Sequence, residues 1–115
     1  MNVVVLIGNL ATDVDLRELD EDRRVANFVI AVDRAGREGA DFFRVSVWNK
    51  QAEACSRLLV RGQRVGVDGR LRSRSWEDTE GKRRSAVDVV AHRVQFLSPP
   101  AGDAAETPFA EAAAA

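Results

Sequence analysis

The segment from Arg64 to Trp76 places arginine and aromatic side chains at every second position, a spacing suited to a ligand that is both charged and aromatic. In an extended strand, alternate side chains point to the same face. The face with this chemistry carries Arg70, Arg72, Arg74 and Trp76. Guanidinium groups bind phosphate oxygens, and an aromatic ring offers a surface on which a base stacks. The pattern therefore indicates a binding surface for unpaired nucleic acid.

The segment from 41 to 50, DFFRVSVWNK, repeats this chemistry. Its apolar set of Phe43, Val45 and Val47 is predicted to face the core. The alternate set is predicted to face outward and consists of Phe42, Arg44, Ser46 and Trp48. We expect the two segments to be neighbouring pieces of one sheet, so that arginines and aromatic rings occur together twice.

Five strands and one helix are predicted to position these side chains. The strands span residues 2–10, 25–33, 41–50, 64–76 and 85–97. The helix is predicted from Lys50 to about Val60, with Asn49 as its N-cap and Gly62 as its stop. Its apolar stripe consists of Ala52, Cys55, Leu58 and Leu59. The first strand is apolar on both sides, so both of its faces are expected to be covered.

A helix between the third and fourth of five strands is the element order of the OB fold, a five-stranded Greek-key barrel that is all-β apart from this helix. Such barrels bind oligonucleotides across the second and third strands and with the loops after the first and fourth strands. Here those loops are residues 11–24, expected to be irregular with some extended structure, and residues 77–84, expected to turn at Gly81. Their basic members are Arg17, Arg23, Arg24, Lys82, Arg83 and Arg84.

Composition fits one small cytoplasmic domain. The chain has 115 residues, 45% of them hydrophobic, which suffices for one core. No apolar run approaches the roughly 18 residues of a membrane span, and residues 1–10 lack the basic region of a secretory signal. The net charge is −1, but all 17 Lys and Arg lie within residues 1–93, which leaves residues 1–97 mildly basic. We expect a soluble protein with no membrane association.

Catalytic and metal chemistry is not indicated. Cys55 is the only cysteine and His92 the only histidine, so neither an internal disulfide nor a zinc cluster is expected. We interpret Cys55 as a small buried helix residue, His92 as a strand residue near solvent, and Glu53 and Asp88 as surface or edge carboxylates. Without a nucleophile and base pair or a glycine-rich phosphate loop, neither an enzyme nor a cofactor is predicted.

The basic and aromatic residues also have simpler interpretations. An outward Trp48 would suit a contact between subunits. The arginines of the fourth strand would suit a solvated face, paired with Asp68, Glu77 and Asp78, as is usual for surface charges. Their occurrence together with Trp76 favours nucleic acid.

Several motifs resemble bacterial single-stranded DNA-binding proteins. They are GNL at 8–10, VANF at 25–28, RVSVWNKQAE at 44–53 and VRGQRVGVDGRLRSRSWEDTEGKRR at 60–84. The resemblance spans residues 1–97 and implies sequence-independent binding of single-stranded DNA in replication, recombination and repair, at the nucleoid. It implies that Phe42, Trp48 and Trp76 stack on bases, while a further aromatic of the family has no counterpart in residues 33–41. It also implies a homotetramer in which the first strand pairs between subunits.

Two other functions fit the same residues. One is an RNA-binding OB module, because stacking and phosphate contacts discriminate poorly between RNA and DNA. The other is an interaction scaffold of the replication or recombination machinery with weak DNA affinity. Competition between oligo-dT and oligo-U distinguishes the first from DNA binding, and tryptophan quenching by oligo-dT distinguishes the second.

Residues 98–115 are predicted to be a disordered, alanine-rich acidic tail. Relatives in the resembled family end in an acidic tip that closes on Pro-Phe and binds partner proteins. Pro108 and Phe109 resemble part of such a tip, but residues 110–115 follow, so Phe109 has no free carboxylate. We therefore expect recruitment of partner proteins through the tail to be poor, and the alternative is an extension with no partner.

Overall fold

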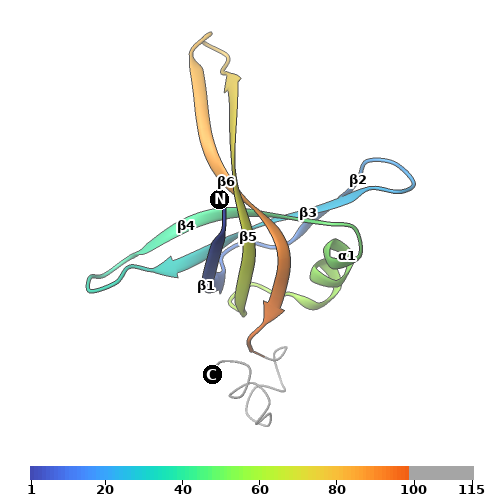
Figure 1. The fold of residues 1–115 in the computed structure, drawn as a ribbon, viewed down its shortest axis with the longest axis vertical. Helices are drawn as coiled ribbons and strands as arrows, with labels where there is room; N and C mark the ends of the chain where they lie inside the picture. The colour runs from blue at the N-terminus through green and yellow to red at the C-terminus, as the bar shows by residue number, and fades with distance from the viewer. Residues whose placement is uncertain (99–115) are drawn as a thin grey trace.

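The computed structural model describes residues 1–98, and within them the chain forms one sheet of six strands and one helix (Figure 1). In chain order the elements are β1 (Val4–Leu10), β2 (Asp15–Glu18), β3 (Arg24–Asp33), β4 (Ala40–Trp48), α1 (Asn49–Leu58), β5 (Arg64–Glu77) and β6 (Arg83–Phe96). The strands lie in the order β1-β5-β6-β4-β3-β2, and a further pairing of β1 with β3 closes five of them into a ring. The predicted all-β OB fold with one helix is confirmed.

Strand β1 closes the barrel by pairing on both sides. Residues 4–9 pair with β5, while Asn9 and Leu10 pair with Ala31 and Ile30 of β3. Gly8 permits this approach, because a Cβ at its position would lie 2.5 Å from the carbonyl oxygen of Ala31. The absence of a side chain at Gly8 is therefore a requirement of barrel closure.

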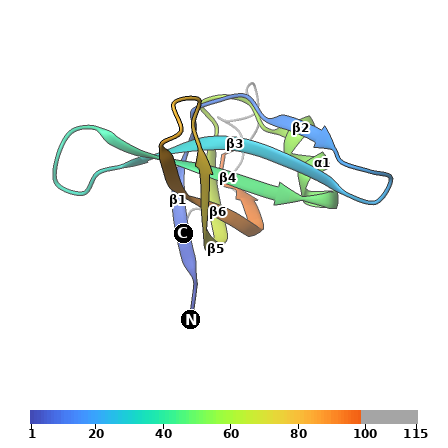
Figure 2. The ribbon, with the colours of Figure 1, turned by 90° about the horizontal axis from the view of Figure 1, so that it is seen from above.

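Strands β5 and β6 form a long hairpin that extends well beyond the barrel (Figure 1). Their pairing runs from Val65 opposite Phe96 to Glu77 opposite Arg83, with a register shift between Asp68 and Gly69. Seen from above, β3 and β4 run side by side across the molecule (Figure 2). The hairpin carries half of the predicted site away from the barrel wall.

The barrel interior is filled by the predicted apolar faces. Val45 and Val47 of β4 are fully buried, as are Ile30 and nearly all of Phe28 on β3. Phe43 is partly buried and packs against this core. The alternation in the sequence therefore predicted the inner face correctly.

Helix α1 is shorter than predicted and begins differently. The N-cap position is Trp48, which makes no side-chain capping bond, and the helix ends at Leu58 instead of near Val60. Asn49 has φ 57°, and its side-chain oxygen accepts a hydrogen bond from the backbone N–H of Arg24, 3.2 Å away. The predicted N-cap was wrong because Asn49 joins the helix to β3.

The helix buries only part of its predicted stripe. Ala52, Cys55 and Leu59 are buried, whereas Leu58 is exposed. Burial raises the pKa of the Cys55 thiol to about 11, so this cysteine has the packing role expected of it. His92, the only histidine of the chain, is exposed on β6, as predicted.

The outward side of β1 is exposed in the single chain. Val5 and Ile7 retain 67% and 47% of their accessible surface, and Val3 just before the strand retains 69%. The expectation that both faces are covered is wrong for residues 1–98 of a single chain, because these side chains stay largely exposed there.

The segment 11–24 contains one strand that the sequence indicated only as partly extended. Strand β2 pairs antiparallel with β3, from Asp15 opposite Asn27 to Glu18 opposite Arg24. The segment 77–84 turns at Gly81, whose φ is 81°, as predicted. The predicted tail, apart from Ser98, lies outside the described residues. Within residues 1–98, no helix is long and apolar enough to cross a membrane.

Candidate nucleic-acid interface

The two segments predicted to be neighbours are separated by a third strand. Strand β6 lies between β4 and β5 and pairs with both. The expectation that β4 and β5 are adjacent was therefore wrong, because the parallel β4–β6 pairing places the last strand of the chain between them.

The register nevertheless puts both outward sets on one face. Paired residues on adjacent strands point to the same side of a sheet. Ser46 pairs with Val90 across β4 and β6, and Val90 pairs with Arg70 across β6 and β5. We call this surface the outer face. On β4, β6 and β5 it comprises Phe42, Arg44, Ser46, Trp48, Arg84, Ala86, Asp88, Val90, Arg70, Arg72, Arg74 and Trp76.

Three aromatic rings on the outer face differ in how much they present to solvent. Phe42 retains 66% of its accessible surface and Trp76 retains 41%, whereas Trp48 is half-buried. Phe42 and Trp48 lie at opposite ends of β4, and Trp76 lies near the tip of the hairpin. The rings are therefore spread along a path and do not form one pocket.

Arginines between these rings are available for phosphate. Arg44, Arg70 and Arg72 are exposed, and none of them forms an ion pair with any residue in the described part of the chain. The pairing partners expected for the arginines of β5 are engaged elsewhere or form no pair in that part of the chain. Asp68 pairs with Arg93 at 3.5 Å, and Asp78 pairs with Arg84 at 2.9 Å.

Arg74 is the exception, because it is held by a buried carboxylate. Its Nε donates a hydrogen bond to Oδ2 of Asp88 at 2.5 Å, and its Cζ lies 4.6 Å from the centroid of the Trp76 ring. Asp88 is 3% exposed. The interpretation of Asp88 as a surface or edge carboxylate was therefore wrong, because β6 has a neighbouring strand on each side and the Asp88 side chain is buried.

The hairpin tip is organised by Asp78. Its Oδ1 accepts hydrogen bonds from the backbone N–H groups of Glu80 and Lys82, and its Oδ2 accepts one from Nε of Arg84. The Arg84 guanidinium, followed by the Lys82 N–H, holds the pKa of Asp78 below its ordinary value. Arg83 pairs with Glu77 in the strand register and so points to the face opposite Trp76. Of the three predicted cations in this loop, Arg84 lies on the outer face, and Lys82 is exposed at the tip.

The basic residues of segment 11–24 lie on different sides of the sheet. Arg17 pairs with Val25, which pairs with Trp48, so Arg17 extends the outer face beside that tryptophan. Its Nε lies 3.1 Å from Oδ2 of Asp15. Arg24 has the opposite parity and forms an ion pair with Glu53 of α1. The structure therefore brings Arg17 to the site and places Arg24 on the helix side.

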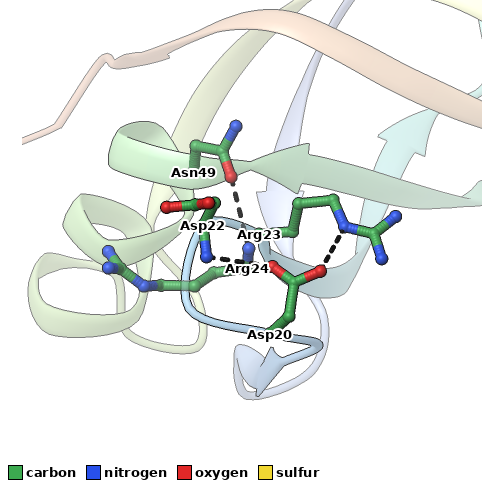
Figure 3. Close-up of polar contacts among 5 residues, drawn as sticks. All are labelled: Asp20, Asp22, Arg23, Arg24 and Asn49. Atoms are coloured by element: carbon green, nitrogen blue, oxygen red, sulfur yellow. Dashed lines mark hydrogen bonds and ion pairs between the residues drawn. The ribbon is translucent and has the colours of Figure 1, made fainter.

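The loop between β2 and β3 is held by its own charges (Figure 3). Asp20 accepts hydrogen bonds from Nε of Arg23, 2.8 Å away, and from the backbone N–H of Asp22, 2.9 Å away. The Arg23 guanidinium, and secondarily the Asp22 N–H, holds the pKa of Asp20 below its ordinary value. Figure 3 also shows the Arg24 backbone tied to the Asn49 side chain. Arg23 therefore stabilises this loop, and Asp20 balances its charge.

Two features of the outer face were missed from the sequence. One is the buried Asp88. Pairing the last two predicted strands as a hairpin sets Asp88 opposite Arg72 and therefore on this face. The other is a hydrogen bond of 2.9 Å from the Ser46 hydroxyl to Oδ1 of Asn27, which links β4 to β3. Among residues 1–98, no group of three or more His, Cys, Asp or Glu side chains is arranged to hold a metal ion.

Known proteins match this chain over the whole barrel. The single-strand binding protein family matches residues 1–97. Single-stranded DNA-binding protein 2 of Listeria innocua is 45% identical over 104 residues, covering 86% of this chain and 65% of the relative. The single-stranded DNA-binding protein of Bacillus cereus is 44% identical, with 86% and 61% covered, and single-stranded DNA-binding protein 1 of Staphylococcus aureus is 40% identical, with 86% and 67% covered. The match thus spans less than two thirds of the Listeria and Bacillus proteins.

Proposed function

This chain belongs to the single-strand binding protein family, and from that premise we propose that it binds single-stranded DNA along the outer face without reading its sequence. Bases stack on Phe42, Trp48 and Trp76, because every base has a π-face whatever its identity. Phosphates bind the arginines that lie between the rings on the same face. The principal members of this set are Arg44, Arg70 and Arg72.

The observation that carries the proposal is the register across three strands. Because Ser46, Val90 and Arg70 are laterally paired, the rings of β4 and the arginines of β5 share one surface. A single strand of DNA offers bases and phosphates along a continuous path, and this surface offers both kinds of contact along such a path. A duplex would hide its bases from the rings, so unpaired DNA is the ligand that fits.

The proposal includes assembly into a homotetramer through β1. Support comes from the exposed apolar side chains of Val3, Val5 and Ile7, and from an edge of β1 that pairs with β3 only at Asn9 and Leu10. An apolar, unpaired edge favours pairing with another strand. Light scattering measures the mass of the assembly directly, and a monomer at micromolar concentration would contradict this part of the proposal.

A role in replication, recombination and repair at the nucleoid follows from the same premise. These processes expose single strands, and a binder that ignores sequence covers them wherever they arise. Depletion of the protein in its own cells, with staining of single-stranded DNA at replication forks, tests this role separately from binding in solution.

Titration of oligo-dT into the protein with tryptophan fluorescence as the readout tests binding. We expect strong quenching and an affinity that falls as salt rises. Equal-length oligo-U and a duplex of the same length serve as competitors. Preference for oligo-U would favour the RNA-binding alternative, and unquenched fluorescence with oligo-dT would favour the interaction scaffold.

A further inference from the structure

Asp88 is a buried carboxylate at the centre of a surface otherwise rich in arginine. On the strand to one side its register partner is Arg72. On the other side, the pairing of Val45 with Val89 places Arg44 next to it on β4. A negative charge here opposes the attraction of the outer face for phosphate, and burying it carries a desolvation cost that needs a good partner. Its presence therefore requires an explanation beyond phosphate binding.

Arg74 supplies that explanation through its two contacts. The Nε group is fixed to Asp88 at 2.5 Å, and the guanidinium carbon lies 4.6 Å from the centroid of the Trp76 ring. A guanidinium over an indole is attracted by the negative face of the ring. The buried carboxylate, the guanidinium and the ring thus form a chain of contacts from the sheet to the surface.

We infer that Asp88 is a positioning residue for base stacking: it holds Arg74 against one face of Trp76 and so presents the exposed remainder of the ring to a base. The inference rests on the proposed function, because the base is its ligand. Arg74 in this arrangement acts mainly on the ring, since the adjacent carboxylate cancels much of its charge toward phosphate. Trp76 lies near the end of β5, on the hairpin that projects from the barrel (Figure 1).

Substitution of Asp88 by Asn separates positioning from electrostatics, because the two predict opposite signs. Removing a carboxylate from a basic surface tightens DNA binding if charge alone matters, most clearly at low salt. If Asp88 positions Trp76, Asp88→Asn weakens oligo-dT binding by roughly fivefold, consistent with partial loss of a stacking contact. That loss should be larger at high salt than at low salt, because salt screens the gain from removing the carboxylate but does not screen stacking.

A matched control is Asp68→Asn. Asp68 is a half-exposed carboxylate of β5, and it pairs with Arg93 at 3.5 Å, not with the arginine that contacts Trp76. This substitution removes the same charge, so it should tighten binding or leave it unchanged. Weakening of both variants by the same factor would overturn the positioning role.

Arg74→Lys provides a second route, because Arg74 is half-exposed and lysine still offers a cation to the buried Asp88. Lysine keeps the charge but lacks the planar fork that stacks on a ring. We expect Arg74→Lys to match Asp88→Asn, and the double variant to be no weaker than either single variant. Additive losses would show that the two residues act independently and would overturn the inference. Arg74→Lys decides the matter if Asp88→Asn does not fold.

The free protein gives a readout that does not depend on DNA. In a Trp48→Phe background, the time-resolved fluorescence anisotropy of Trp76 reports the local motion of this ring alone. Both variants should increase that motion, and unchanged motion would overturn the inference. Failure of the wild-type protein to bind oligo-dT would refute the proposed function instead, with the anisotropy still deciding whether Asp88 restrains the ring.

Discussion

The side-chain amide of Asn2 forms two hydrogen bonds with the backbone of Leu71. Its Nδ2 donates to the Leu71 carbonyl at 2.7 Å, and its Oδ1 accepts from the Leu71 N–H at 2.8 Å. Asn2 precedes β1, and Leu71 lies just beyond Gly69, where the paired residues of β1 and β5 end. One side chain therefore extends the ladder of β1 and β5 to the base of the projecting hairpin.

Asn2→Ala should loosen this junction. Because the contact is exposed, we expect a loss of only about 0.5–1.5 kcal/mol in the free energy of unfolding, together with faster hydrogen exchange of the Leu71 amide. Asn2→Asp keeps the acceptor but sets a carboxylate oxygen against the Leu71 carbonyl, so its effect should be at least as large. An unchanged exchange rate at Leu71 in Asn2→Ala would contradict this role.

Trp76→Ala should weaken oligo-dT binding by about 1–3 kcal/mol, the cost of losing one stacked base. Leu71→Ala is a matched control, because Leu71 and Trp76 are equally exposed on β5, at 42% and 41%, but lie on opposite faces. Fluorescence anisotropy of labelled oligo-dT measures both variants. Equal losses in the two would show that the whole hairpin, and not its outer face, determines affinity.

Arg72→Ala should reduce the salt dependence of binding. Arg72 has no ion-pair partner among residues 1–98, so its full charge is available to a phosphate. The slope of log affinity against log salt should fall by about 0.7. Arg57→Ala removes an equal charge from the last turn of α1 and should leave the slope unchanged. No difference between the two slopes would place the DNA elsewhere.

Arg24→Gln should affect stability and not DNA affinity. The Arg24 side chain is 31% exposed and forms its ion pair with Glu53 on the helix side of β3, so we expect a loss of about 0.2–1 kcal/mol on unfolding by urea. Glu53→Gln should produce a similar loss, and the double variant should lose little more. If Arg24→Gln bound oligo-dT more weakly and Glu53→Gln did not, Arg24 would belong to the DNA-binding surface.

The order of the hairpin tip should depend on pH through Asp78. The pKa of this carboxyl is held below its ordinary value of 3.8, chiefly by Arg84. A depressed pKa means that the ionised form stabilises the folded tip above pH 3.8, and that this contribution disappears as pH falls through the lower folded value. The Lys82 amide, which donates to Asp78, should lose its protection from exchange in that acidic range by NMR. In Asp78→Asn, the protection of the Lys82 amide should no longer change in this acidic range. If the same acid transition remained in this variant, a group other than Asp78 would be responsible for it.

Local patterns predicted which residues of the candidate site share a face. Alternation along residues 64–76 was sufficient to place Arg70, Arg72, Arg74 and Trp76 on one face, because side chains of a strand point to alternate sides whatever surrounds the strand. The same reasoning gave the core faces of β3 and β4. It failed at Asn49, where a contact with Arg24, distant in the sequence, replaces the local capping bond.

The sequence by itself determined which residues share a face within each strand and that the elements follow the order of an OB barrel. Only the tertiary structure decided that β6 separates the two basic and aromatic segments, that Asp88 is buried beside Arg74, and that Arg24 faces the helix. The physical reason is that alternation is a property of one strand. Register, burial and ion pairing depend on which distant strands meet, and that is settled by the closing of the barrel as a whole.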